Sequence, residues 1–110
     1  MYRLLVIACA TLASSVAATG SAESLPNPYD IQVNDQLERL ENSTPAVRAS
    51  AAESLGLLRA YRSELPLLDR LNDPVAEVRR EIAMALSWCG GRRSIAPLTR
   101  SLDDEDWTVR

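Results

Sequence analysis

The chain repeats itself at intervals of 31 residues, and this regularity restricts the possible fold more than any other feature. Four independent series keep the interval: Leu40, Leu71 and Leu102; Val47, Val78 and Val109; Arg48, Arg79 and Arg110; Asn42, Asp73 and Asp104. A fixed spacing in several series predicts one structural unit that is used repeatedly. Units of this size bury their apolar surfaces against their neighbours, so the spacing predicts a stacked array.

Each unit contains a long and a short helical pattern separated by turn residues. In the second unit Asp73 is suited to cap a helix and Pro74 to be its first residue, because proline lacks an amide hydrogen that would have no helical partner there. The pattern ends at Gly90-Gly91. Apolar residues before that stop recur at three- and four-residue steps, as on one buried helical stripe: Val75, Val78, Ile82, Ala85, Leu86 and Cys89.

We therefore predict an all-α fold, an α-solenoid of stacked antiparallel helix pairs. Long helices are expected at about 45–59 and 74–89, and short helices at about 34–41, 63–71 and 94–102. Stacking neighbouring pairs about 8–10 Å apart would close a continuous apolar core that a single pair cannot make.

The expected organisation is an export signal, an irregular lead-in and a repeat array. Pro26, Asn27 and Pro28 give the lead-in its irregular character, and the third unit is truncated after the start of a long helix. The predicted segments are the signal peptide 1–22, the lead-in 23–33, and an array 34–110 made of 34–62, 63–93 and the incomplete 94–110.

The first 22 residues have the features of a cleaved export signal. Arg3 gives a positive start, Leu4–Val16 is a run of apolar and small residues, and Gly20-Ser21-Ala22 offers a cleavage site. A retained membrane anchor is the alternative, but the run is interrupted by polar residues and is shorter than the roughly 20 apolar residues of a spanning helix. We expect an exported protein, periplasmic or secreted, with no stable membrane insertion after cleavage.

The composition excludes several kinds of chemistry. Histidine and lysine are both absent, which excludes serine–histidine and cysteine–histidine catalysis, histidine-ligated metals and Schiff-base chemistry within these residues. Removal of the signal leaves 11 arginines against 15 acidic residues, a net charge of −4, whereas nucleic-acid binders are normally basic. Cys89 would be the sole remaining cysteine, at an apolar position of the repeat. We predict no catalytic, cofactor or metal site, no nucleic-acid partner, and no enzyme activity.

The amino-acid sequence of the unit resembles the HEAT-like repeats first noted in phycobilin lyases. The resemblance covers roughly residues 34–110, in three stretches: NSTPAVRASAAESLGLL, NDPVAEVRREIAMALSWCGG and SIAPLTRSLDD. It implies the stacked helix pairs described above but does not fix a function, because such repeats occur in scaffolds, chromophore lyases and iron hydroxylases. The hydroxylases use His-Glu pairs, which this chain lacks.

The resemblance also implies a polar ladder between neighbouring units. In the family the aspartate of the turn and the arginine that follows valine usually pair from one unit to the next. Carried over to this sequence, the ladder consists of Arg48, Arg79, Asp73 and Asp104, with Asn42 as a weaker first member. We expect these residues to be structural.

The long helices depart from the family pattern at positions that usually carry exposed charge. Arg80, Met84 and Trp88 are four residues apart and share one side of a helix, and Leu57 corresponds to Trp88 one unit earlier. Long helices usually line the concave side in this family, so these residues, with Glu53 at the edge, are a candidate protein-binding strip. The alternative is that the lead-in, with Tyr29 and Ile31, covers the strip.

Two functional hypotheses follow from these observations. The favoured one is a non-catalytic scaffold that offers its concave helical face to a protein partner of unknown identity. The other is a fragment of an enzyme or chromophore lyase-type protein whose chemistry lies beyond residue 110.

Overall fold

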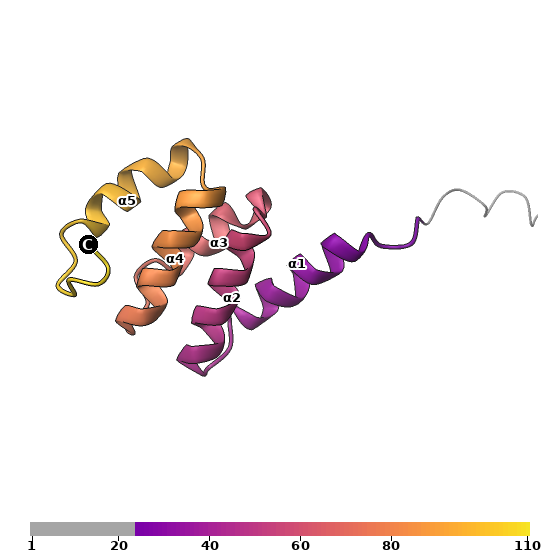
Figure 1. The fold of residues 1–110 in the computed structure, drawn as a ribbon, viewed down its shortest axis with the longest axis horizontal. Helices are drawn as coiled ribbons and strands as arrows, with labels where there is room; N and C mark the ends of the chain where they lie inside the picture. Colours follow the sequence, from indigo (N-terminus) through magenta and orange to yellow (C-terminus); the bar gives the residue numbers. More distant parts are fainter. Residues whose placement is uncertain (1–23) are drawn as a thin grey trace, which may run out of the picture.

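The computed structural model describes residues 24–110, and in that range the chain is all-helical, which confirms the predicted class (Figure 1). The export signal expected at 1–22 lies outside the described residues. Short 3-10 turns, η1 (Tyr61–Ser63) and η2 (Arg92–Ser94), lead into two of the helices. The helices are α1 (Pro28–Arg39), α2 (Pro45–Leu57), α3 (Glu64–Asp69), α4 (Ala76–Cys89) and α5 (Ile95–Ser101).

The expectation of an irregular lead-in at 23–33 is wrong for most of that range, because α1 already begins at Pro28. Asn27 caps the helix: its side-chain oxygen accepts the backbone N–H of Tyr29 at 3.0 Å. Asn27 and Pro28 therefore act as a cap followed by a proline in the first turn, the combination that starts helices elsewhere in proteins. Among the described residues of the lead-in, only 24–27 are irregular.

The predicted start of the second long helix is also wrong by two residues. The side chain of Asp73 does accept a backbone N–H, from Val75 at 2.9 Å, but this bond closes an Asx turn that precedes the helix. Pro74 lies within that turn, and α4 begins at Ala76. The same turn occurs one unit earlier, where Asn42 accepts the N–H of Thr44 at 2.9 Å.

The end of α2 also differs from the prediction, since the helix stops at Leu57 and not at residue 59. Arg59 adopts a left-handed conformation with φ of 49°. The N–H of Ala60 then reaches the carbonyl of Leu55 at 3.1 Å, and the N–H of Arg59 reaches that of Gly56 at 3.0 Å. These two bonds form a Schellman motif, which satisfies carbonyls at the helix end.

The core lies mainly between the two long helices. Helices α2 and α4 lie side by side and share the largest interface in the described chain, with α1 packed on α2 and α3 on α4 (Figure 1). A Cβ at Gly56 would lie 2.9 Å from the Cα of Ala85, so glycine allows the two helices to approach closely. The largest fully buried apolar side chains are Leu40, Leu55, Leu67, Ile82, Leu86, Val33 and Val78.

The α5 end of the described chain is less well packed than the rest. Leu102 is 60% exposed, whereas its equivalents Leu40 and Leu71 are buried. No residue of α5 is buried, because no other described helix packs over its outer side. None of the helices within residues 24–110 has the length and apolar character required to cross a membrane.

Candidate functional site

The first rung of the predicted ladder joins the turn before α2 to the turn before α4. Arg48 binds both carboxylate oxygens of Asp73, through Nε at 2.8 Å and Nη2 at 3.1 Å. Its remaining nitrogen, Nη1, donates to the carbonyls of Asn42 at 2.9 Å and Ser43 at 3.0 Å. A single guanidinium therefore fixes its own turn and the turn of the next unit, a task suited to its planar fork of donors.

The second rung repeats this geometry one unit later. Arg79 binds Asp104 through Nε at 2.9 Å and Nη2 at 3.1 Å, and its Nη1 donates to the carbonyls of Asp73 at 2.8 Å and Pro74 at 3.2 Å. The structure thus brings together all four residues of the arginine–aspartate ladder, Arg48, Asp73, Arg79 and Asp104. Asn42 contributes its carbonyl to the first rung, while its side chain makes the local turn.

The electrostatics of the ladder keep it charged at neutral pH. Burial alone would raise the pKa of Asp73, but hydrogen bonds from Arg48 and the N–H of Val75 outweigh it, so the pKa is lowered. Hydrogen bonding to Arg79 lowers the pKa of Asp104, and the same contact raises the pKa of Arg79. Groups held in one charge state stabilise a fold but do not exchange protons near neutral pH.

A third polar contact between units was missed by the sequence analysis. Glu64 of α3 accepts the backbone N–H of Gly91 at 2.6 Å and the hydroxyl of Ser94 at 2.8 Å. The hydrogen bond from Gly91, followed by that from Ser94, lowers the pKa of Glu64. The contact could not be found from the repeat, because the equivalent positions are Val33 and Ile95.

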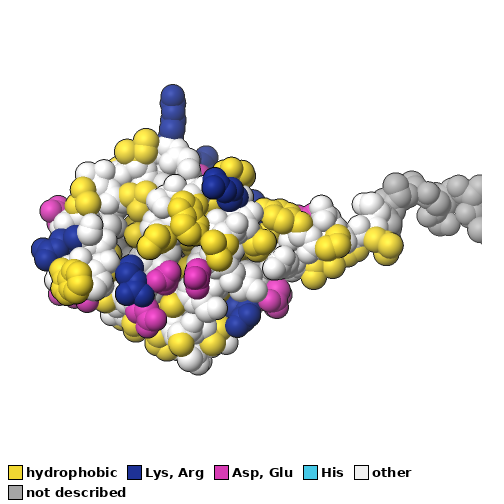
Figure 2. Space-filling model, in the orientation of Figure 1, with side chains coloured by type: hydrophobic (Ala, Val, Ile, Leu, Met, Phe, Trp, Pro, Cys, Tyr) yellow, Lys and Arg dark blue, Asp and Glu magenta, His cyan; other side chains and the backbone are white. Residues whose placement is uncertain are grey.

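The predicted protein-binding strip lies on the surface. Leu57 is 64%, Met84 47% and Trp88 41% exposed. The alternative that the lead-in covers the strip does not hold for the described residues: the hydroxyl of Tyr29 reaches only the carbonyl of Leu58, at 3.3 Å. Figure 2 shows hydrophobic side chains gathered over the region that α2 and α4 occupy in Figure 1, with acidic side chains below them.

Trp88 is exposed on one side and supported on the other. A Cβ at Gly56 would lie 3.1 Å from Cε3 of Trp88, so the indole lies directly over the glycine backbone. Arg80, the charged member of the predicted strip, donates two hydrogen bonds to Glu81 at 3.1 and 3.0 Å. Glu53 is exposed and makes no ion pair with any residue that the structure describes. The strip is thus an exposed apolar surface beside acidic side chains.

A comparison of the sequence with known families gives a match. A family model described as HEAT repeats matches residues 33–110. The chain belongs to the HEAT-repeat family. A search of curated proteins gave no match.

The other chemically interesting groups of this HEAT-repeat chain are structural. Cys89 is buried, burial raises the pKa of its thiol, and the sulfur contacts the carbonyl of Ala85 at 3.1 Å, so it is not poised as a nucleophile. No cluster of three metal-binding side chains occurs in residues 24–110. A groove of about 350 Å³ between α3 and α5 contains Asp104 at one end, but that carboxylate is already engaged by Arg79.

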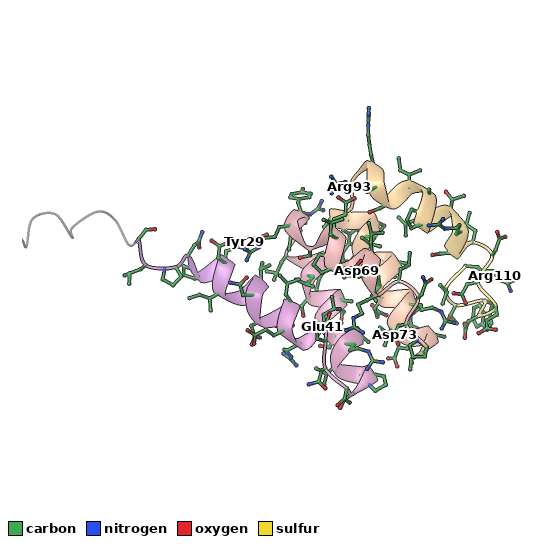
Figure 3. All side chains as sticks on the ribbon, turned by 180° about the vertical axis from the view of Figure 1, so that it is seen from behind. Tyr29, Glu41, Asp69, Asp73, Arg93 and Arg110 are labelled. Carbon is green, nitrogen blue, oxygen red and sulfur yellow. The ribbon has the colours of Figure 1, made fainter. Side chains whose placement is uncertain are left out.

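Figure 3 shows where Asp73, one residue of the ladder, lies relative to the long helices. Asp73 lies near the N-terminal end of α4, and Arg93 projects outward at the opposite end of that helix (Figure 3). The ladder therefore fixes one end of the α2–α4 layer, while the apolar strip, at the C-terminal ends of the same helices, stays free. A layer held in this way can present side chains in a fixed arrangement.

Proposed function

We propose that this chain is an exported, non-catalytic HEAT-repeat scaffold that binds a protein partner through the surface of α2 and α4. The observation that carries the proposal is the exposed strip of Leu57, Met84 and Trp88 on two helices that the ladder holds together. Exposed aromatic and methionine side chains on a rigid surface are typical of protein interfaces. HEAT repeats commonly mediate protein–protein interaction, which agrees with this role.

The proposed architecture is an α-solenoid with a 31-residue period, of the type also found in phycobilin lyases. Its support is the ladder, because Arg79 makes to Asp104 the same two bonds that Arg48 makes to Asp73. Identical contacts one unit apart require the turns to be related by nearly the same translation. The scaffold holds its binding surface by this repetition and needs no cofactor.

Crosslinking tests the binding surface. A Met84→Ala, Trp88→Ala double variant is compared with an Ile95→Ala, Leu65→Ala double variant, which removes two exposed apolar side chains elsewhere. The first variant should lose the crosslinked partner in cells, and the second should retain it, while circular dichroism shows both folded. Retention of every partner by the first variant would contradict the proposal.

Mass measurement tests export. The protein recovered from the periplasm or medium should begin at Glu23, since the small residues Gly20-Ser21-Ala22 precede it. A full-length chain retained in the membrane or cytoplasm would be the contrary result.

A further inference from the structure

Eight side chains form one continuous surface on the two long helices, here called the α2–α4 face. Four positions on α4 lie within one side of the helix, and the four that precede them by 31 residues lie at the same places on α2. Seven of these residues are exposed, and Glu81 is half-buried. The α2–α4 face consists of Ala46, Ser50, Glu53 and Leu57 on α2 and Glu77, Glu81, Met84 and Trp88 on α4.

The face is divided into an apolar half and an acidic half. Its apolar members are grouped toward the C-terminal ends of the helices: Leu57, Met84 and Trp88. Glu77 and Glu81 lie on the N-terminal side of these residues, and Glu53 lies level with Met84, whose position it occupies one unit earlier. In Figure 2 acidic side chains lie along one edge of a hydrophobic patch over the region of α2 and α4.

The acidic half carries negative charge that is not neutralised within the described chain. Arg80 pairs with Glu81, at 3.0 Å. Glu53 and Glu77 make no ion pair with residues 24–110. Two carboxylates next to an apolar surface favour a partner that brings positive charge, because a complementary potential both attracts the partner and fixes its register.

The spacing of the two halves limits the shape of that partner. Met84 follows Glu77 by seven residues, so the two side chains are about 10 Å apart along α4 at the usual helical rise. Two turns of a partner helix span the same length. An apolar side chain on such a helix would therefore meet the strip while a basic side chain two turns away meets Glu77.

We infer that the α2–α4 face takes a basic amphipathic helix, with apolar side chains over Leu57, Met84 and Trp88 and arginine or lysine over Glu53 and Glu77. This inference rests on the proposed function, because it specifies the partner of the same surface. Arg59 lies two residues beyond Leu57 and is exposed, so the partner's positive charge belongs at the acidic end and not at the apolar end.

Trp88 fluorescence offers a direct test with synthetic peptides. A Trp107→Phe background leaves Trp88 as the only tryptophan of the chain. Two helical peptides share the same leucine stripe, and one carries arginine where the other carries glutamate. The arginine peptide should shift Trp88 emission and bind about tenfold more tightly, an advantage that salt reduces.

Matched variants locate the charge effect. Glu53→Gln with Glu77→Gln should weaken binding of the arginine peptide about tenfold. Glu38→Gln with Asp69→Asn removes two exposed charges on α1 and α3 and should leave binding unchanged. Equal binding of both peptides, abolished by Leu57→Ala with Met84→Ala, which keeps Trp88 as the reporter, would overturn the inference and leave the binding surface intact. Equal binding that survives that variant would overturn both the inference and the proposed binding surface, and no binding of either peptide would overturn the inference.

Discussion

The two rungs of the ladder have the same chemistry but different surroundings. In the first rung the side chains of Arg48 and Asp73 are 10% and 1% exposed, and in the second those of Arg79 and Asp104 are 12% and 13% exposed. The first rung lies between two packed helix pairs, whereas the second lies next to the loosely packed α5. Equal bonds therefore do not imply equal stabilisation, because the neighbouring units determine how far each carboxylate is withdrawn from water.

The largest loss of stability is expected at low pH, because protonation of the carboxylates weakens both rungs at once. Asp73, Asp104 and Glu64 all have lowered pKa values, so the unfolded chain binds protons that the folded chain does not. Their contribution to stability is present above the unfolded pKa of about 4 and is lost as pH falls through the folded values. Thermal unfolding followed by circular dichroism should show a falling melting temperature below about pH 4. An unchanged melting temperature there would contradict this assignment.

Replacing one aspartate at a time distinguishes the contributions of the two rungs to the stability of the fold. Asp73→Ala leaves the charge of Arg48 buried without a carboxylate partner and should lower the free energy of unfolding by about 3 kcal/mol. Asp104→Ala removes the same bonds from a more exposed site, and its effect should be clearly smaller. Urea unfolding of both variants measures the difference. Equal losses would show that burial does not distinguish the rungs.

The close approach of the long helices gives a second contrast between neighbouring units. Gly56→Leu would push against Ala85 and Trp88 and should cost about 2 kcal/mol, as overpacked cores do. Ser87 is the equivalent residue on α4 and is exposed, so Ser87→Leu should change stability little. The urea midpoints of the two variants test this contrast, and a large loss for Ser87→Leu would refute it.

Two equivalent serines allow a smaller comparison. The Ser94 hydroxyl donates to Glu64, but the Ser63 hydroxyl has no hydrogen-bond partner among the described residues, because Val33 occupies the position of Glu64. Ser94→Ala should cost about 1 kcal/mol, while Ser63→Ala should be neutral or slightly stabilising. Differential scanning calorimetry can resolve the pair, and the reverse order would exclude this explanation.

The smallest effect concerns the helix ends. Arg59 has a positive φ, which glycine adopts with less strain, whereas Gly90 one unit later has φ of −79°. Arg59→Gly should therefore stabilise the chain by about 0.5 kcal/mol. A thermal shift measurement would show a small rise in melting temperature. A decrease would mean that the Arg59 side chain stabilises the fold by more than the backbone strain costs.

Much of the fold could be predicted, because the apolar spacing and the turn residues act locally. The existence of every helix was predictable in this way, whereas the sequence left open whether the N-terminal segment covers Leu57, Met84 and Trp88. The start of α4 was not, since the same Asp73 side chain can cap a helix or close a turn before it. The sequence misassigns the lead-in because asparagine and proline are common both in irregular segments and at helix starts. Here Asn27 and Pro28 start α1.

The sequence by itself determined the helical class and the repeating unit, because both depend on residue types at fixed spacing, and the resemblance to HEAT-like repeats implied the pairing of arginine with aspartate. Only the tertiary structure decided how deeply each rung is buried, that Glu64 reaches the turn at Gly91, and that the indole of Trp88 lies over Gly56. These features depend on atoms that are distant in the chain and adjacent in space. A repeat that is regular in sequence can therefore have unequal stability and unequal exposure along its length.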